Sequence, residues 1–189
     1  SVNTDNYMGG YQAASLLARH HCETLFYIDS PCPESRPAYG RLKGFSAFCQ
    51  EQDLDNEIII RSFENDYEAT QKLLSGILDY FEENFTGQKK GIFLASDTLA
   101  NVLLNLLIRR HGCLPGDYQI IGFDNSPISR EAVLSISTMG QQIRTLAYEA
   151  VSLLVEQMNE QKKRKPVPWE KPVHKIIPPE FFRRETTEQ

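Results

Sequence analysis

The residues of this chain that could do chemistry stand at the ends of two short apolar runs. Residues 91–95 are followed by Ser96, and residues 119–123 are followed by Asp124 and Asn125. Each run has the length and composition of a fully buried strand. Because open α/β sheets bind ligands at the carboxyl ends of their strands, we expect these polar side chains to form one wall of a small-molecule cleft.

Further polar side chains stand at the ends or starts of predicted elements. Sugar recognition uses such a mixture, since carboxylates accept hydrogen bonds from vicinal hydroxyls, arginine donates in a fixed fork and an aromatic ring packs on the C–H face. Simpler roles remain open: Asp5 and Asp97 precede predicted helices and would serve as N-caps, and Arg41 would form a surface ion pair. The candidate hydroxyl-binding residues are Asp5, Arg41, Asp97, Asp124, Asn125 and Gln141.

Patterns for other chemistries are missing from the sequence. There is no G-x-x-x-x-G-K-[ST], no G-x-G-x-x-G after a strand, no H-E-x-x-H and no G-x-S-x-G. An enzyme that uses Asp97 and Asp124 as paired carboxylates lacks a nucleophile–base pair. The spacing of His21, Cys22 and Cys32 fits no tetrahedral zinc site. We therefore expect no enzymatic activity, no metal and no cofactor.

Composition narrows the class of protein. The chain has 189 residues and a net charge of −5, so a basic face for DNA binding is not expected within it. No apolar run approaches the roughly 20 residues that span a bilayer. The four cysteines contain no CxxC, and the sequence shows no secretory signal. Reduced thiols in a cytoplasmic protein without membrane contact are the expectation.

Strands and helices alternate along the chain. Four strand–helix repeats of this kind predict a parallel sheet with helices on both faces. The predicted strands are 25–28, 57–62, 91–95 and 119–123, with shorter pieces at 136–139, 173–177 and 181–183; the predicted helices are 5–19, one ending near 52, 67–84, one from 97 to a stop at Gly112, and 141–160.

The helix that contains residues 99–108 is apolar on more than one side. Four of its leucines, 103, 104, 106 and 107, cannot all face one sheet. A second apolar face favours a partner subunit, so we expect a homodimer.

Taken together, these segments resemble the effector-binding core of the lactose-repressor/galactose-repressor (LacI/GalR) transcription regulators. The resemblance covers nearly the whole chain, in the right order and spacing, and the run 114–125 is its most specific part. It is carried by Asp5–Tyr7 with Gly9 and Gly10, by Ser35 and 41–45, by 93–97, by 114–125, and by Ser137, Thr138, Gln141 and 184–186.

The resemblance implies a two-lobed, periplasmic-binding-protein-like α/β core with a parallel sheet and helices on both faces. The second lobe would be nearly complete and the first fragmentary. The chain would cross between the lobes near His21, near Met139 and within 162–171. The expected parts are residues 1–21 in the first lobe, 22–138 in the second lobe, 139–162 as a helix of the first lobe, and 163–189 as a linker and final strands of the second lobe.

The resemblance also implies an effector site. Asp5, Arg41 and Asp124 would contact effector hydroxyls. Gln141 would lie near the hinge, and Phe63 would be the aromatic residue that packs on the sugar. Ser96 stands where the family usually has asparagine, so Asp97 beside it is interpreted as a helix cap. The implied effector-binding residues are Asp5, Arg41, Phe63, Ser96, Asp124 and Gln141.

The function that the resemblance implies is the effector-binding core of a DNA-binding transcription regulator of carbohydrate metabolism genes. Its ligand would be a small sugar or a sugar phosphate. Operator DNA would be contacted only through an N-terminal domain that this sequence does not contain. The alternative is a transport-type sugar-binding protein of the same fold.

Overall fold

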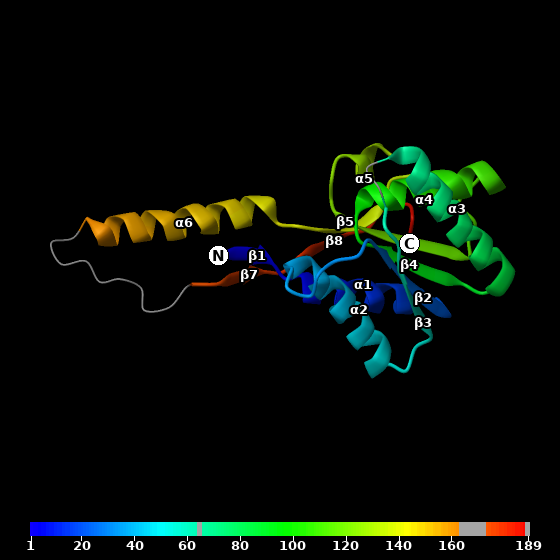
Figure 1. Cartoon of the computed structure of the whole chain (residues 1–189), viewed down its shortest axis with the longest axis horizontal. Helices are drawn as coiled ribbons and strands as arrows, with labels where there is room; N and C mark the ends of the chain where they lie inside the picture. The colour runs from blue at the N-terminus through cyan, green and yellow to red at the C-terminus, as the bar shows by residue number, and fades with distance from the viewer. Residues whose placement is uncertain (64–65, 163–172, 188–189) are drawn as a thin grey trace.

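A six-stranded sheet forms the body of the computed structural model, which describes residues 1–63, 66–162 and 173–187 (Figure 1). The strand order is β3-β2-β4-β5-β6-β8, and only β8 runs antiparallel to its neighbour. The strands are β2 (Thr24–Asp29), β3 (Asn56–Ile60), β4 (Lys90–Leu94), β5 (Tyr118–Asp124), β6 (Ser137–Gly140) and β8 (Glu180–Phe182).

Helices cover both faces of this sheet, as the alternating pattern predicts. Successive side chains of a strand point to opposite faces. Phe26 and Ile28 of β2 therefore pack with α3 and α4, whereas Leu25 and Tyr27 pack with α1 and α2. The helices are α1 (Asn6–Arg19), α2 (Gly40–Glu51, after the short η1, Pro37–Tyr39), α3 (Tyr67–Asn84), α4 (Asp97–His111) and α5 (Ile128–Glu131).

Local sequence signals set several helix ends. The Asp66 side chain accepts hydrogen bonds from the backbone amides of Glu68 and Ala69 and so caps α3. Gly112 ends α4 in the left-handed conformation that glycine adopts without a Cβ penalty.

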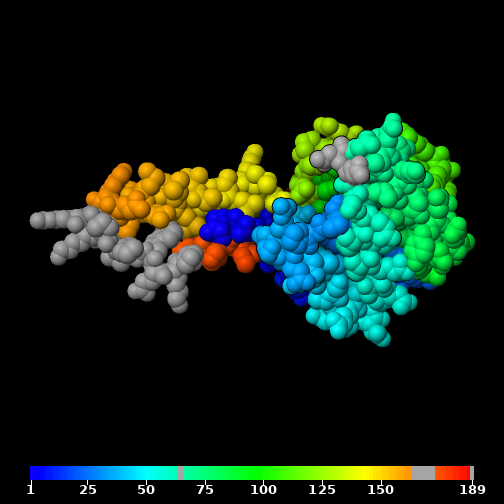
Figure 2. Space-filling view, viewed as in Figure 1, coloured from blue at the N-terminus to red at the C-terminus, as the bar shows by residue number. Residues whose placement is uncertain are grey.

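A separate arm extends from the carboxyl edge of the sheet (Figures 1 and 2). It consists of β1 (Val2–Thr4), the parallel strand β7 (Lys175–Ile177) and α6 (Ile143–Gln161), which lies beside them. No residue of α6 is buried. Its apolar side chains include Tyr148, which is 70% exposed.

The arm corrects the expected division of the chain. Residues 1–21 were assigned to the first lobe, but α1 packs on α2 and on the six-stranded sheet through Ala13, Ala14 and Leu17. Small side chains of α1 allow this contact, and helical periodicity alone does not reveal which sheet a helix covers. Of the final strands, β7 lies in the arm and β8 in the main sheet.

The crossings between arm and body also differ from the expected positions. They lie at Thr4–Asp5, at 140–142 and at 178–179. The expected crossing near His21 is wrong, because that residue follows a helix that already belongs to the body. The expected crossing at 162–171 falls mostly on 163–172, outside the described residues.

The argument for a partner subunit on α4 is also wrong. Leu103, Leu104, Leu106 and Leu107 are all buried within the single chain. Helix α4 contacts the sheet on one side, and α3 and α5 on others. Its all-round apolar surface is therefore explained without a second copy.

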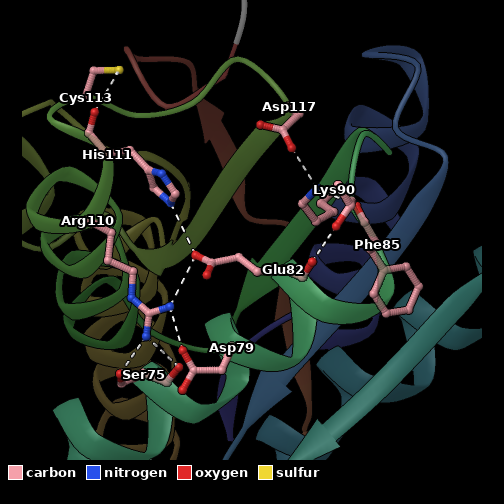
Figure 3. Close-up of polar contacts among 10 residues, drawn as sticks. Ser75, Asp79, Glu82, Phe85, Lys90, Arg110, His111, Cys113 and Asp117 are labelled. Carbon is pink, nitrogen blue, oxygen red and sulfur yellow. Dashed lines mark hydrogen bonds and ion pairs between the residues drawn. The ribbon is translucent and has the colours of Figure 1, made fainter.

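Polar contacts join α3, α4 and the start of β4 at the amino edge of the sheet (Figure 3). Arg110 forms an ion pair with Asp79 at 2.7 Å, and Lys90 forms one with Asp117 at 2.7 Å. The ammonium of Lys90 also donates to the carbonyl oxygens of Phe85 and Gln88. This buried charge is thus fully hydrogen-bonded, as burial requires.

Candidate functional site

The carboxyl edge of the parallel strands gathers polar side chains from segments far apart in the sequence. Asp29 ends β2, Ser96 follows β4, Asp124 ends β5 and Gln141 follows β6. The chain goes from β2 outward to β3 and then returns to β4 on the other side of β2. The gap between β2 and β4 is therefore the topological switch point, where sheets of this kind bind ligands.

Arg41, in the first turn of α2, is held firmly at this edge. Its Nε donates to Asn6 Oδ1 at 2.8 Å, and its Nη1 donates to the carbonyl oxygen of Ala95 at 2.6 Å. Its guanidinium carbon lies 3.7 Å from the centre of the Phe123 ring, in a cation–π contact. These contacts fix the arginine fork between α1 and β4.

Two glycines allow α1 and α2 to come close enough for these contacts. A Cβ on Gly10 would overlap the carbonyl oxygen of Arg41, and a Cβ on Gly44 would overlap that of Tyr7. The helix crossing therefore determines where Arg41 meets Asn6.

Asp124 and Gln141 are joined by a hydrogen bond at this edge. Gln141 Nε2 donates to Asp124 Oδ1 at 2.7 Å, and Gln141 Oε1 accepts from Thr4 Oγ1 at 2.8 Å. Asp124 has a φ of 105°, a conformation that a non-glycine residue rarely adopts. This chain of hydrogen bonds connects the end of β5 to two segments that cross into the arm.

Asp97 is not the cap of α4. The cap is Ser96, whose hydroxyl accepts from the amide of Leu99 at 3.3 Å. Asp97 is buried and accepts from Thr138 Oγ1 and from both the amide and the hydroxyl of Ser126. Burial raises the pKa of this carboxyl above its ordinary value, although the hydrogen bonds act in the opposite direction.

The side-chain oxygen of Asn125 is engaged within the protein. Its Oδ1 accepts from Arg184 Nη2 at 2.5 Å, and its amide donates to Thr138 Oγ1. Asn125 also adopts a left-handed φ of 52°. Together with Asp97, it ties the segment that follows Asp124 to β6 and to Arg184.

A pocket of about 470 Å³ opens at the switch point. Phe63 and Ser96 both line it, as do Asp29 and Asp66. Phe63 also packs against the core, so one ring face is fixed. Two of the six sequence-predicted site residues thus share this pocket, whereas Asp124 and Gln141 form the group nearer the arm.

Asp5 is the N-cap of α1, which is the simpler role considered for it. Its Oδ1 accepts from the amide of Met8 at 2.9 Å. The other carboxylate oxygen of this half-buried side chain is a further hydrogen-bond acceptor beside Asn6 at the same edge.

Sequence reasoning missed Asp29 and Thr4. Asp29 carried the same signal as Ser96 and Asp124, namely a polar residue directly after a buried strand. Thr4 gave no signal, because its partner Gln141 is 137 residues away. No group of three metal-binding side chains occurs in 1–63, 66–162 or 173–187. Over the same residues, no helix is both long and apolar enough to cross a membrane.

The periplasmic binding protein-like domain family matches residues 13–187 of the chain. The ribose operon repressor of Halalkalibacterium halodurans is 28% identical over 157 residues, which are 83% of this chain and 45% of that repressor. The sucrose operon repressor of Pediococcus pentosaceus is 24% identical over 158 residues, 83% of this chain and 46% of that protein. The chain thus spans about half the length of the curated relatives it matches.

A solved structure is similar over the whole chain. It is a periplasmic binding protein/LacI transcriptional regulator from Alkaliphilus metalliredigens, complexed with D-xylulofuranose. The TM-score is 0.76 at 26% identity, and the match covers 100% of this chain and 65% of that chain. This similarity confirms the expected fold class, with one lobe nearly complete and the other fragmentary.

Proposed function

The chain belongs to the periplasmic binding protein-like domain family, and on this premise we propose that it is the effector-binding part of a sugar-responsive transcription regulator. The resemblance to LacI/GalR repressors that the sequence indicated is confirmed by the relatives. Those relatives do not favour the transport-type alternative, and they are regulators rather than enzymes.

One observation carries the proposal. The hydroxyl-binding side chains of the edge are hydrogen-bonded to the segments that lead into the arm. Asp124 is connected through Gln141 to Thr4. Arg41 is connected to Asn6, whose Nδ2 donates to the carbonyl oxygen of Thr4 at 3.1 Å. A ligand that competes for Asp124 or Arg41 therefore acts on the crossings themselves.

The coupling follows from differential binding. A sugar that contacts the edge and a facing lobe favours the lobe arrangement in which both sets of contacts form. Coupling free energies between such sites are about 1–3 kcal/mol. In the whole regulator, this shift would change how a homodimer places its DNA-binding segments on operator half-sites.

From the similarity to sugar-operon repressors we also propose the effector, the DNA contact, the location and the oligomeric state. The effector is a small sugar, in keeping with the operons named for the relatives. Operator DNA is contacted by a segment outside the 189 residues. The regulator acts in the cytoplasm, as a homodimer, and catalyses no reaction.

Saturation-transfer NMR on the 189-residue chain tests the proposal, because it detects weak binding. Ribose, xylulose, glucose and sucrose are the probes. We expect at least one to bind, and Arg41→Ala or Asp124→Ala to weaken it about 10-fold or more, since hydrogen bonds to charged groups contribute about 1.5–3 kcal/mol.

Matched controls lie at the opposite edge of the sheet. Arg19→Ala and Asp55→Ala remove an exposed charge of the same sign without touching the site, and we expect unchanged binding. Equal loss in the control variants, or no loss in the site variants, would contradict the assignment of the site.

A further inference from the structure

Asp29 is a carboxylate that is hydrogen-bonded within the fold but is not paired with a cation of the described residues. It caps no helix of the described residues. Its Oδ2 accepts from the hydroxyl of Tyr27 at 2.6 Å, and its Oδ1 accepts from the amide of Ser30 at 2.7 Å. Tyr27 is completely buried, so the carboxylate is held in a fixed orientation.

This carboxylate lies in the wall of the switch-point pocket. Asp66 is a second carboxylate in the wall, and no described lining residue is lysine, arginine or histidine. The rest of the wall supplies an aromatic ring from Phe63 and hydroxyls from Ser30 and Ser96. Such a wall suits a ligand with hydroxyl donors and an apolar C–H face.

The cation that acts on Asp29 is already engaged. Arg41 donates to Asn6 and Ala95 and stacks on Phe123. Its charge lowers the pKa of Asp29, but burial has the larger effect and the pKa is raised. The negative charge of the pocket wall is therefore only partly compensated.

We propose that Asp29 is a specificity-determining residue that makes the pocket accept uncharged and amino sugars and reject sugar phosphates. This inference rests on the proposed function, because it takes the pocket to be the effector site. Hydroxyl and ammonium groups donate to the free lone pairs of the carboxylate. A phosphate would bring two further negative charges beside Asp29 and Asp66, where partial burial strengthens repulsion.

Matched ligands test this on the 189-residue chain. The probes are ribose with ribose 5-phosphate, and glucose with glucosamine and glucose 6-phosphate, measured by saturation-transfer NMR. We expect each phosphate ester to bind at least about 10-fold more weakly than its parent sugar, and glucosamine to bind at least as tightly as glucose.

Asp29→Asn removes the charge and keeps the size of the side chain. We expect the penalty against the phosphate esters to fall several-fold and the preference for glucosamine to disappear, while binding of the parent sugar changes by no more than about 3-fold. Asp66→Asn, at an exposed cap, should shift the ratios in the same direction by less. Asp55→Asn, at the opposite edge, is the control and should shift neither ratio.

The outcomes separate the two claims. Preference for the phosphate esters in the parent chain, or unchanged ratios in Asp29→Asn, overturns the role of Asp29 and leaves the proposed function standing. Binding of none of these probes and none of the neutral sugars overturns the proposed function and this inference with it.

Discussion

Asp97 is the buried acid on which the geometry of the edge depends. Its two oxygens join α4 to the hydroxyl of Thr138 in β6 and to Ser126 in the loop after β5. A carboxylate with three donors is well satisfied by hydrogen bonds, yet desolvation still raises its pKa. The folded protein therefore binds a proton at Asp97 more readily than the unfolded chain does.

The raised pKa of Asp97 makes the free energy of unfolding depend on pH. Between the ordinary pKa near 4 and the higher folded value, the folded state binds more protons, so the free energy of unfolding falls as pH rises. Asp97→Asn removes this contribution. We expect the variant to be less stable than the parent, with a deficit that shrinks as pH rises from about 4 to 7.

Urea unfolding at several pH values measures this difference. Asp55→Asn, which removes an exposed carboxylate, serves as the matched control for the loss of one acidic side chain. A deficit of Asp97→Asn that grows as pH rises would contradict the assignment of the raised pKa.

At the scale of elements, the crossing of α1 and α2 is the contact that sets the site. Gly10 and Gly44 leave no room for a side chain, because each faces a carbonyl oxygen of the other helix. Gly10→Ala or Gly44→Ala would push the helices apart. We expect a loss of about 1–3 kcal/mol of stability and weaker sugar binding, since Arg41 lies in the first turn of α2.

Gly76 in α3 offers the matched control. A Cβ there meets nothing within 4 Å. Gly76→Ala should therefore raise the free energy of unfolding by about 0.5–1 kcal/mol, because alanine loses less backbone entropy in a helix. Thermal and urea unfolding of the three variants measure these changes in stability. Similar changes at all three positions would show that helix propensity, and not the close contact of α1 with α2, determines the effect of alanine at Gly10 and Gly44.

Individual elements were predictable from the sequence because their signals are local. The apolar period of α3, the cap at Asp66 and the stop at Gly112 lie within a few residues of the features they determine. Asp124 and Gln141 were expected at the edge because each stands directly at the end or start of a predicted element. The packing of α1 on the body was not predictable, because it depends on which partner its small residues meet. The capping of α4 by Ser96 in place of Asp97 was not predictable either, because Asp97 accepts hydrogen bonds from Thr138 and Ser126, which are distant in the sequence.

At the scale of the whole molecule, the arm leaves apolar surface in contact with water. On α6, Tyr148, Val151 and Val155 recur at helical spacing and are 70%, 59% and 47% exposed. An exposed apolar stripe of this kind promotes association. We expect the 189-residue chain to self-associate through this face of α6.

Light scattering with size-exclusion chromatography measures this association. Tyr148→Gln combined with Val151→Lys should lower the average molar mass and change the free energy of unfolding by no more than about 0.5 kcal/mol. Leu73→Lys, which replaces an exposed apolar residue of α3, is the control and should leave the molar mass unchanged. A parent chain that stays monomeric at high concentration would contradict this prediction.

The pairing of β1 with β7 has a consequence for the order in which the parts of this chain fold. Val2 pairs with Lys175, which lies 173 residues further along the sequence, so the two strands can pair only after a long loop has closed. Until then, Val2–Thr4 has no ladder partner, while β2 to β6 with their helices can already assemble from contacts closer in sequence. Since closing so long a loop costs entropy before any contact offsets it, we expect β1 and β7 to pair after β2 to β6 have assembled, with the body as the template on which the arm closes.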